Sequence, residues 1–330
     1  MTIKKESSKM KSDRKRGRSR SYIPNLAEFY FEPAYDWSKK EAEKLFKSKT
    51  HALGDFEQDN VYYEECISGM KQLPKSCIDL VVADPPFGIE FDGLSSVYNR
   101  DDSLVIPGYE EIQDSYADFT KQWVAELPRV MKKDASAYIF SGWTNLDAIL
   151  NAAREAGLIA LNHIIWHYPF GVYTKRRFVT SHYHILLLVK NQKSYFFNKV
   201  ENYPEDVWIV KRKYRTGLTK NSTKLPIEVV SKCIDYSSRP GDIILDPFMG
   251  NGTTAISSKG AFRHFIGFEI NKRLKRYVSK EIESIAPGQS YIPYKDRLPT
   301  VDELAEMYPR AYRVYLKQGE LDKSKQAKNE

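Results

Sequence analysis

The segment that decides the fold is Ile243–Thr254, with the sequence IILDPFMGNGTT. Its first three residues are apolar and predict a short buried strand, and the loop after them leads into a helix predicted over residues 253–260. The glycines Gly250 and Gly252 let the backbone approach a ligand closely, and the first turn of a helix offers unpaired N–H groups. The segment therefore predicts a ligand-binding turn between a strand and a helix.

The strand that follows this helix ends in an acidic residue, Glu269, which closes the run Gly267-Phe268-Glu269. A carboxylate in this position of a β-α-β unit can accept hydrogen bonds from both hydroxyls of an adenosine ribose. The loop has neither the GxGxxG spacing of dinucleotide-binding proteins nor the GK[ST] ending of phosphate-binding loops. The motif favours a nucleoside-containing ligand of another kind, and an ordinary strand–helix turn is the alternative.

A second distinctive turn, Asp84-Pro85-Pro86-Phe87, follows the apolar run Ile78–Ala83. The two prolines end the strand, stiffen the turn and supply no N–H groups, so the local backbone is rich in hydrogen-bond acceptors. The Asp84 carboxylate and a proline carbonyl can together accept both hydrogens of an exocyclic amino group, which would make its nitrogen nucleophilic. Phe87 can stack on the base that carries this amine. A rigid strand-ending turn is the alternative.

Apolar runs and helical patterns alternate along the chain from residue 61 onward. This alternation predicts an α/β fold with a mostly parallel sheet and helices on both faces. Ligands of such sheets bind beyond the carboxyl ends of the strands, so both turns can face one site. The predicted strands are 61–66, 78–83, 137–141, 162–166, 183–189, 243–245 and 265–269, and the predicted helices are 38–49, 109–131, 145–156, 225–236, 253–260 and 271–285.

The net charge of +8 is concentrated in two basic segments, residues 1–20 and 171–224, and the rest of the chain is net acidic. This distribution favours a polyanionic partner, most simply nucleic acid, although a solvated tail and loop would give the same composition. The expected organisation is a disordered basic tail (1–21), an N-terminal arm (22–60), an α/β domain (61–285) with a basic insert (about 171–224), and a C-terminal extension (286–330).

The composition argues against several classes of protein. The longest apolar run, Ile185–Val189, is too short to span a bilayer, and no apolar stretch follows the basic N-terminus, so we expect neither a membrane span nor a secretory signal. Three cysteines without CxxC spacing argue against a disulfide framework. We expect a cytoplasmic protein without a metal, because His163, His167, His182 and His184 lack a carboxylate or cysteine at ligand spacing and are expected in the core or facing DNA.

The two turns, Asp84–Phe87 and then Phe248–Thr254, resemble the permuted (beta-class) S-adenosylmethionine-dependent DNA amino-methyltransferases, usually the modification enzymes of restriction–modification systems. The resemblance covers about residues 61–285, including the stretches Glu65–Pro74, Ile164–Pro169 and Ser181–His184. It implies a Rossmann-like methyltransferase fold, with a mostly parallel seven-stranded sheet, helices on both faces and a circularly permuted motif order.

The resemblance also implies roles for single residues. It makes Asp84, Pro85, Pro86 and Phe87 the catalytic loop. It implies that S-adenosylmethionine is bound by Asp246, Phe248, Gly250, Gly252, Thr253 and Glu269, with Glu65 near the adenine ring. The family often has the motif H-P-T-x-K-P before the strand that leads to the cofactor loop. Thr223 and Pro226 match this motif, so Thr223 is added to the predicted cofactor site. The lysine of the motif is displaced by one position, to Lys224. In the family, a glutamate commonly follows the histidine that corresponds to His182, and this chain has Tyr183 in that position.

We therefore expect a site-specific enzyme that methylates an exocyclic amino group of a flipped base in double-stranded DNA. Adenine N6 is favoured over cytosine N4, because the loop begins with Asp rather than Ser. Methylation at cytosine C5 needs a Pro-Cys nucleophile, and Glu65, Ser76 and Lys232 precede the three cysteines. The expected DNA contacts of the basic insert are Lys175, Arg176, Arg177, Lys211, Arg212, Lys213 and Arg215.

Two alternatives of different kinds stay open at this point. One is a methyltransferase that acts on RNA or on protein amides, because loops of the D-P-P-F type also serve those amines. The other is a basic nucleic-acid-binding protein without enzymatic activity on a Rossmann scaffold. A cognate restriction endonuclease is the expected genetic partner, and the sequence does not indicate an oligomeric state.

Overall fold

The structure is a computed structural model that describes residues 33–86, 116–169, 171, 174–176, 178–201, 204–211 and 224–297, with short pieces between 303 and 317. Residues Glu32–Arg297 form one compact unit. The basic tail that the sequence predicts to be disordered lies outside the described residues.

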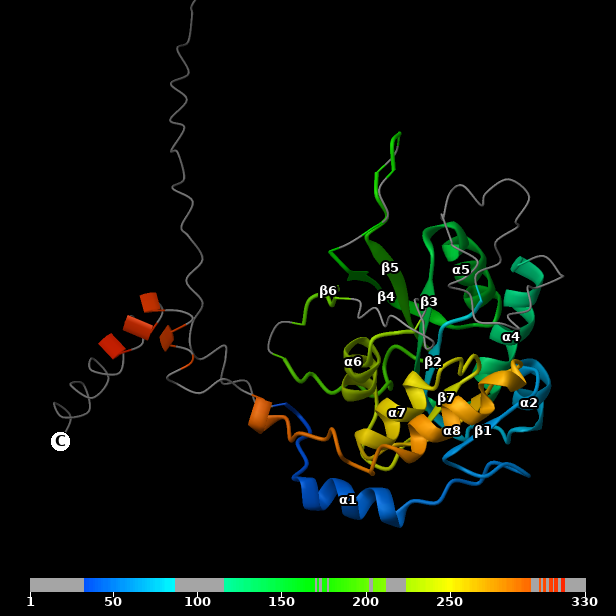
Figure 1. Cartoon of the computed structure of the whole chain (residues 1–330), viewed down its shortest axis with the longest axis horizontal. Coiled ribbons are helices and arrows are strands. Elements are labelled where there is room, and N and C mark those ends of the chain that lie inside the picture. The colour runs from blue at the N-terminus through cyan, green and yellow to red at the C-terminus, as the bar shows by residue number, and fades with distance from the viewer. Residues whose placement is uncertain are drawn as a thin grey trace, which may run out of the picture. The chain divides into compact units, whose positions relative to one another are not determined.

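The described strands form an eight-stranded sheet in the order β1-β8-β7-β2-β3-β5-β4-β6 (Figure 1). β5 is antiparallel to both of its neighbours, and all other neighbouring strands are parallel. The mostly parallel sheet is thus confirmed, with eight strands in place of seven because the basic insert adds β6. The strands are β1 (Asn60–Tyr62), β2 (Ile78–Ala83), β3 (Met131–Ser141), β4 (Ile159–His167), β5 (His182–Val189), β6 (Val207–Ile209), β7 (Ile243–Asp246) and β8 (His264–Phe268).

The apolar run that predicted β2 is buried on both faces of the sheet. Val81 and Ala83 belong to one hydrophobic cluster, and Leu80 and Val82 belong to the cluster on the opposite face. A strand covered on both sides needs apolar residues at every position, which explains why this sequence does not alternate with polar residues.

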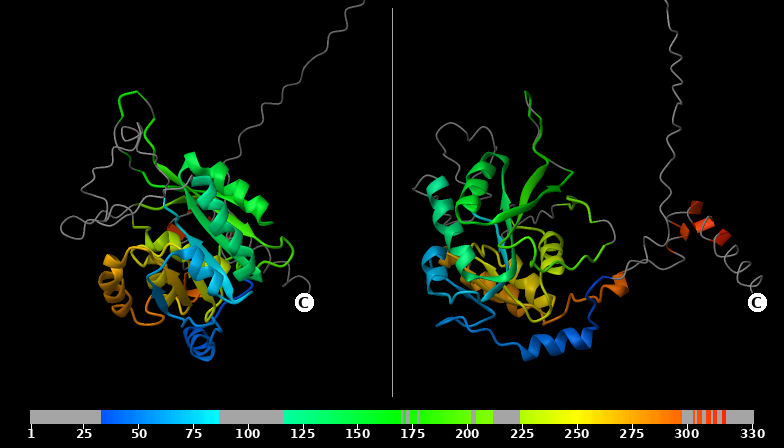
Figure 2. Two further views of the ribbon diagram at one scale, coloured as in Figure 1. Left: turned by 90° about the vertical axis from the view of Figure 1, so that its right-hand side faces the viewer. Right: turned by 180° about the vertical axis from the view of Figure 1, so that it is seen from behind.

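Helices cover both faces of the sheet, as expected (Figure 2). One layer packs on the cluster that includes Val81, and the other packs on two clusters of the opposite face, which include Leu80 and Phe265. No helix in the described parts of the chain is both long and apolar enough to cross a bilayer. The first layer holds α2 (Cys66–Gln72), α4 (Tyr116–Val130) and α5 (Leu146–Glu155), and the second holds α6 (Ile227–Ser237), α7 (Thr253–Gly260) and α8 (Lys275–Glu283).

Two predicted strand boundaries differ most from the observed ones. The strand predicted over residues 61–66 ends at Tyr62, because the Glu65 carboxylate caps α2 by accepting hydrogen bonds from the backbone N–H groups of Ile67 and Ser68, each at 2.8 Å. β3 begins at Met131 rather than at 137, directly after α4 and in parallel pairing with β2. The charged start of this strand carries no apolar pattern that the sequence could reveal.

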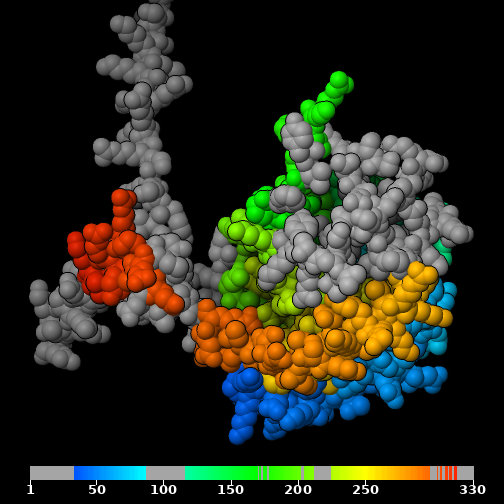
Figure 3. Space-filling model, viewed as in Figure 1, coloured from blue at the N-terminus to red at the C-terminus, as the bar shows by residue number. Residues whose placement is uncertain are grey.

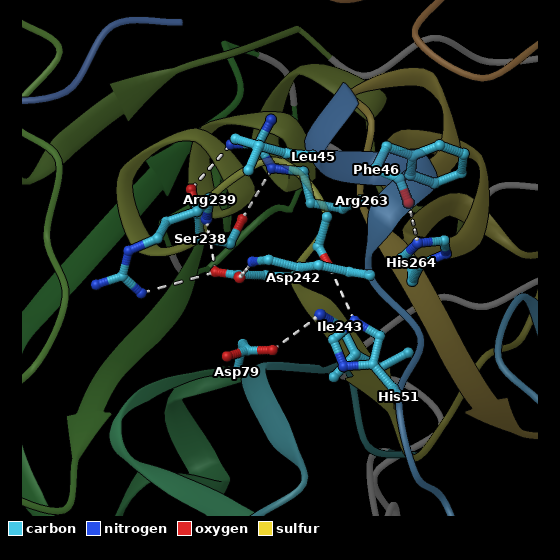
Figure 4. Close-up of polar contacts among 12 residues, drawn as sticks. Leu45, Phe46, His51, Asp79, Ser238, Arg239, Asp242, Ile243, Arg263 and His264 are labelled. Atoms are coloured by element: carbon cyan, nitrogen blue, oxygen red, sulfur yellow. Dashed lines mark hydrogen bonds and ion pairs between the residues drawn. The ribbon is translucent and has the colours of Figure 1, made fainter. Parts of the chain in front are cut away.

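The amino-terminal edge of the sheet is fixed by buried polar groups (Figure 4). Asp79 in β2 accepts hydrogen bonds from the backbone N–H of Ile243 at 3.0 Å and from the Lys132 ammonium at 2.8 Å. Burial and the nearby charge of Asp242 raise the pKa of Asp79, and Lys132 opposes this effect. Asp242 itself accepts a hydrogen bond from Lys49 at 2.7 Å. The network therefore ties the segment before β1 to the centre of the sheet.

The first helix, α1 (Lys39–Ser48), lies beside the residues that follow α8 (Figure 3). Its Phe46 carbonyl is 2.9 Å from Nε2 of His264, and the Tyr291 hydroxyl donates a hydrogen bond to the Trp37 carbonyl at 2.7 Å. The described parts of the predicted arm and extension thus pack on the same body as the sheet, and the proposed domain boundaries stay a prediction.

Candidate active site

The double-proline turn leaves the sheet at the carboxyl end of its central strand. β2 pairs with β7 on one side and with β3 on the other, and Asp84 follows its last residue. Pro85 is buried, and Asp84 and Pro86 are half-buried. Because proline has no N–H group, the pairing with the neighbouring strands ends here. Phe87 lies outside the described residues.

The glycine loop leaves the neighbouring strand β7 at the same edge. The backbone N–H of Met249 donates to the Phe268 carbonyl at 2.8 Å, and that of Gly252 donates to the Met249 carbonyl at 2.9 Å. Gly250 and Gly252 have φ angles of 49° and 77°, in the left-handed region that favours glycine. A Cβ atom on Gly252 would also lie 3.0 Å from Cγ1 of Val278. The loop therefore holds a tight conformation that places the amino terminus of α7 at the edge.

Glu269 binds this loop through its side chain. One carboxylate oxygen accepts the N–H of Gly250 at 2.7 Å, and the other accepts the N–H of Asn271 at 2.7 Å. Burial raises the pKa of Glu269, and these backbone hydrogen bonds oppose that rise. A carboxylate oxygen has lone pairs for a second hydrogen bond, so Glu269 can still accept hydroxyl donors from a ligand.

The register of the sheet brings the two turns together. Val81 of β2 is paired with Leu245 of β7, two residues before the end of the first strand and one residue before the end of the second, so the two strands end at nearly the same level. Paired strands lie about 4.8 Å apart. The aspartate of the double-proline turn and the glycine loop therefore share the carboxyl edge of two adjacent central strands, while the chemical roles assigned to these residues stay predictions.

Asp246 ends β7 beneath the glycine loop and is buried. Its carboxylate accepts a hydrogen bond from the N–H of Phe248 at 2.9 Å. Burial raises the pKa of Asp246 to about 7; hydrogen bonds from Thr254 and Phe248 lower it, and the charge of Glu269 raises it further. Asp246 therefore fixes the start of the glycine loop through its hydrogen bond with Phe248. Its pKa of about 7 lies close to neutral pH.

The buried carboxyl of Asp246 leads to a prediction about stability. A carboxyl whose pKa is raised in the folded state favours folding in its neutral form, so its contribution is present below the unfolded pKa of about 3.9 and is lost as the pH rises through about 7. Urea unfolding from pH 4 to 8 should show the wild type losing on the order of 4 kcal/mol relative to Asp246→Asn. A stability difference that does not change with pH would contradict this assignment.

Aromatic packing beneath the loop supports the backbone from the α4 side. The Phe248 ring meets Trp123 edge-on at 5.2 Å between centroids and lies 6.0 Å from Phe119. Gly267 of β8 leaves room for Met249, since a Cβ atom there would lie 2.0 Å from the Met249 Cε. The sequence indicated that Gly250 and Gly252 are special, but it gave no signal for Gly267 because that contact comes from the fold.

Two further residues lie near Glu269 that the sequence analysis did not single out. The hydroxyl of Tyr63 is buried without a hydrogen-bond partner among the described residues, and burial together with the charge of Glu269 raises the pKa of Tyr63 to about 12. Ile270, directly after Glu269, has an exposed side chain (54%). The sequence could have indicated Ile270, because it is an apolar residue directly after the acidic end of a predicted strand. Glu65, by contrast, uses both carboxylate oxygens to cap α2.

The remaining residues of the predicted cofactor site are Thr253 and Thr223. Thr253 is buried, and its hydroxyl donates to the Leu225 carbonyl at 3.3 Å, which joins the start of α7 to the segment before α6. Thr223 lies outside the described residues. The displaced Lys224 forms an ion pair with Glu281 of α8 at 3.3 Å and lies over the Tyr277 ring. Its charge is therefore used within the protein.

The basic insert is not one continuous unit. Its residues 182–189 form β5, an interior strand between β3 and β4, so the basic residues come from two segments on either side of that strand. Lys175, Arg176 and Lys211 are exposed. The other predicted DNA contacts, Arg177, Arg212, Lys213 and Arg215, lie outside the described residues.

The predicted histidine group lies on the paired strands β4 and β5. Nε2 of His163 is 2.7 Å from Nδ1 of His184, and the His182 ring meets the His184 ring edge-on. Burial and the neighbouring imidazoles lower the pKa of His184 to about 4. Within the described ranges, no three potential ligands are grouped so that they could hold a metal ion.

The cysteines do not have the properties of nucleophiles. Cys66, Cys77 and Cys233 are all buried and unpaired. Burial raises the pKa of each thiol, to about 11 for Cys77 and above that for the other two. A thiolate is the reactive form, so these environments oppose the chemistry of C5 methylation.

Comparison with protein families identifies a close match. The N6/N4 methyltransferase model, described as DNA methylase, matches residues 78–281, which is well over half of the chain. This range begins with β2 and includes both turns and Glu269.

The chain is also similar to individual DNA methyltransferases. The chain is 29% identical over 248 residues to the type II methyltransferase M.HinfI of Haemophilus influenzae, covering 69% of each chain. It is also 29% identical over 247 residues to the DNA adenine methyltransferase YhdJ of Escherichia coli K12, covering 65% of this chain and 79% of YhdJ. A crystal structure titled M1.HpyAVI-SAM complex superposes with a TM-score of 0.53 at 23% identity, covering 68% of this chain and 98% of that one.

Proposed function

We propose, on the premise that this chain belongs to the DNA methylase family, that it transfers a methyl group from S-adenosylmethionine to an exocyclic amino group of DNA, with adenine N6 as the target. The observation that carries this proposal is the placement of Asp84 beside the glycine loop at the ends of adjacent central strands. One turn offers acceptors for an amine, and the other offers a nucleoside site next to it.

The residues at this edge fit the cofactor. Glu269 retains lone pairs for the two ribose hydroxyls, and the exposed Ile270 beside it can pack on the adenine ring. The buried Tyr63 hydroxyl, which has no described partner, can be satisfied by a polar group of the ligand. When bound, S-adenosylmethionine supplies an electrophilic methyl group on its sulfonium sulfur.

Asp84 and the proline carbonyls orient the amine. By accepting both of its N–H groups, they draw the nitrogen lone pair out of conjugation with the base and direct it toward the glycine loop. Catalysis by these residues rests mainly on positioning and electrostatic stabilisation. The amine loses a proton after the transfer, and Asp84 and water are the bases available to receive it.

The DNA must release its target base from the helix to reach this edge, at a cost of a few kcal/mol. Exposed Lys175, Arg176 and Lys211 on the segments around β5 and β6 can hold the phosphate backbone during this step. Arg177, Arg212, Lys213 and Arg215 are proposed to hold the phosphate backbone in the same way. Thr223 is proposed to contact the cofactor, and Phe87 is proposed to stack on the target base. Double-stranded DNA in the cytosol, with a cognate endonuclease encoded alongside, is the setting in which this activity would operate.

Adenine is preferred to cytosine on two grounds. The loop begins with Asp84, and the similar YhdJ protein is named a DNA adenine methyltransferase. The same pair of acceptors would serve cytosine N4, so the second candidate is the N4 reaction at the same site.

The test is methyl transfer followed by nucleoside analysis. Purified protein is incubated with methyl-labelled S-adenosylmethionine and unmethylated plasmid DNA, with RNA as a competitor, and the DNA is digested to nucleosides. We expect label in N6-methyldeoxyadenosine and no competition by RNA. Label in N4-methyldeoxycytidine would favour the second candidate, and label in RNA alone or no transfer would overturn the proposal.

A further inference from the structure

One large apolar side chain stands exposed beside the catalytic edge. Trp143 is 62% exposed, whereas Trp123, Trp166 and Trp208 are buried and Trp37 is half-buried. All five tryptophans of the chain belong to the described residues. Trp143 is therefore the tryptophan available to an external partner, and water contact with an indole of this size is unfavourable.

The register of β2 and β3 places Trp143 next to the double-proline turn. Ala83, the last residue of β2, is paired with Ile139, and β3 ends two residues later at Ser141. Trp143 follows two residues later, at the start of the 3-10 helix η3 (Trp143–Asn145). Trp143 therefore follows the strand on one side of β2, and the glycine loop follows the strand on its other side.

The backbone that carries Trp143 is anchored. The N–H of Asn145 donates to the Gly142 carbonyl at 3.2 Å, and the Ser141 hydroxyl donates to the same carbonyl at 2.8 Å. Asn145 is buried, and α5 begins at the next residue. An exposed side chain on a fixed turn can bind a partner without a large loss of backbone entropy.

Exposed apolar residues flank both sides of the two turns. Along the strand order β8-β7-β2-β3, Ile270 follows the first strand and Trp143 follows the last. The proposed cofactor accounts for Ile270 on the β8 side. The β3 side is where a base presented to Asp84 would lie, and every base has a flat face that can stack on an indole.

We infer that Trp143 is a stacking platform for a base of the bound DNA beside Asp84, and this inference rests on the proposed function. Its role is positioning, because stacking fixes the plane of the base while Asp84 and the proline carbonyls hold the edge that carries the amine. The contact is independent of base identity, so Trp143 contributes to affinity and alignment and leaves sequence recognition to other residues.

Tryptophan fluorescence tests the contact directly. A short duplex containing the methylated position, mapped beforehand on plasmid DNA, is titrated into wild type and Trp143→Phe. We expect the duplex to quench the emission of the wild type and to leave that of Trp143→Phe unchanged, although both bind. Equal quenching of both proteins, or binding to the wild type without quenching, would overturn the inference.

Methylation kinetics supply the second readout. Trp143→Ala should lower kcat/KM for DNA by about 10- to 100-fold, and Trp143→Phe should restore most of it because a phenyl ring also stacks. The affinity for S-adenosylmethionine and the Tm should not change, as Trp143 is exposed. The matched control is Ile292→Ala, an exposed apolar residue (51%) after α8, which should leave the kinetics unchanged.

These outcomes separate the two proposals. If the wild type methylates DNA while Trp143→Ala is equally active, the stacking role is wrong and the proposed function stands. If the wild type transfers no methyl group to DNA, the proposed function fails and the inference fails with it.

Discussion

Replacing Asp84 with alanine is expected to lower kcat for methyl transfer by about 10²- to 10³-fold or more. The alanine variant keeps only the proline carbonyl as an acceptor, so one amine hydrogen has no partner, and the nitrogen lone pair is neither drawn out of conjugation with the base nor directed at the methyl donor. Because Asp84 is half-buried at the end of β2, outside the hydrophobic clusters of the sheet, the fold should survive the change.

Single-turnover methylation with saturating cofactor measures this effect without a contribution from product release. Asp84→Asn is the matched variant, because its amide oxygen keeps one acceptor, and we expect it to retain more activity than alanine. Cofactor affinity should be unchanged in both, since Glu269 and the glycine loop are untouched. Full activity of the alanine variant would show that the double-proline turn is only structural.

Replacing Glu269 with alanine is expected to weaken the binding of S-adenosylmethionine by about 100-fold or more, from the loss of two hydrogen bonds to a charged acceptor. The change also removes the partner of the Gly250 N–H, so the glycine loop loses a contact that shapes it. Both effects act on the cofactor side of the site, and the affinity for DNA should change little.

Calorimetric titration with S-adenosylhomocysteine measures this loss in the absence of turnover. Glu269→Gln keeps an oxygen acceptor and should fall between wild type and alanine. Glu283→Ala, an exposed glutamate on α8, is the control and should bind as the wild type does. Unchanged affinity in Glu269→Ala would place the cofactor away from the end of β8.

Much of the sheet could be predicted because burial leaves a strong pattern. β2 and β7 are apolar at nearly every position, and each is followed by a turn with proline or glycine, so both strand ends were visible in the sequence. The helix after the glycine loop was predicted with its observed bounds, Thr253–Gly260. These features depend on local sequence, where composition and periodicity carry the information.

The missing features depend on contacts between distant segments. β6 has only three residues and is defined by its pairing with β4, and β3 begins in a charged stretch that is a strand because β2 lies beside it. Glu65, which the resemblance places near the adenine ring, caps α2 with its carboxylate, and this second role was not predicted. Its position after β1 left both roles open, and only the fold reveals what the side chain contacts.

The same distinction applies to the active site. Asp84, Asp246 and Glu269 could be singled out because an acidic residue at the end of a buried strand is unusual. Tyr63 and Trp143 carried no such signal. The buried hydroxyl of Tyr63 and the exposed indole of Trp143 can be linked to the site only once the order of the strands is known.

The most direct test of the central claim, that the double-proline turn and the glycine loop form one site, is a crystal structure of the protein with S-adenosylmethionine. We expect the ribose hydroxyls to be bound to Glu269, the cofactor to lie along the glycine loop, and its methyl group to face Asp84. A cofactor bound at another edge of the sheet, or one whose methyl group points away from Asp84, would contradict it.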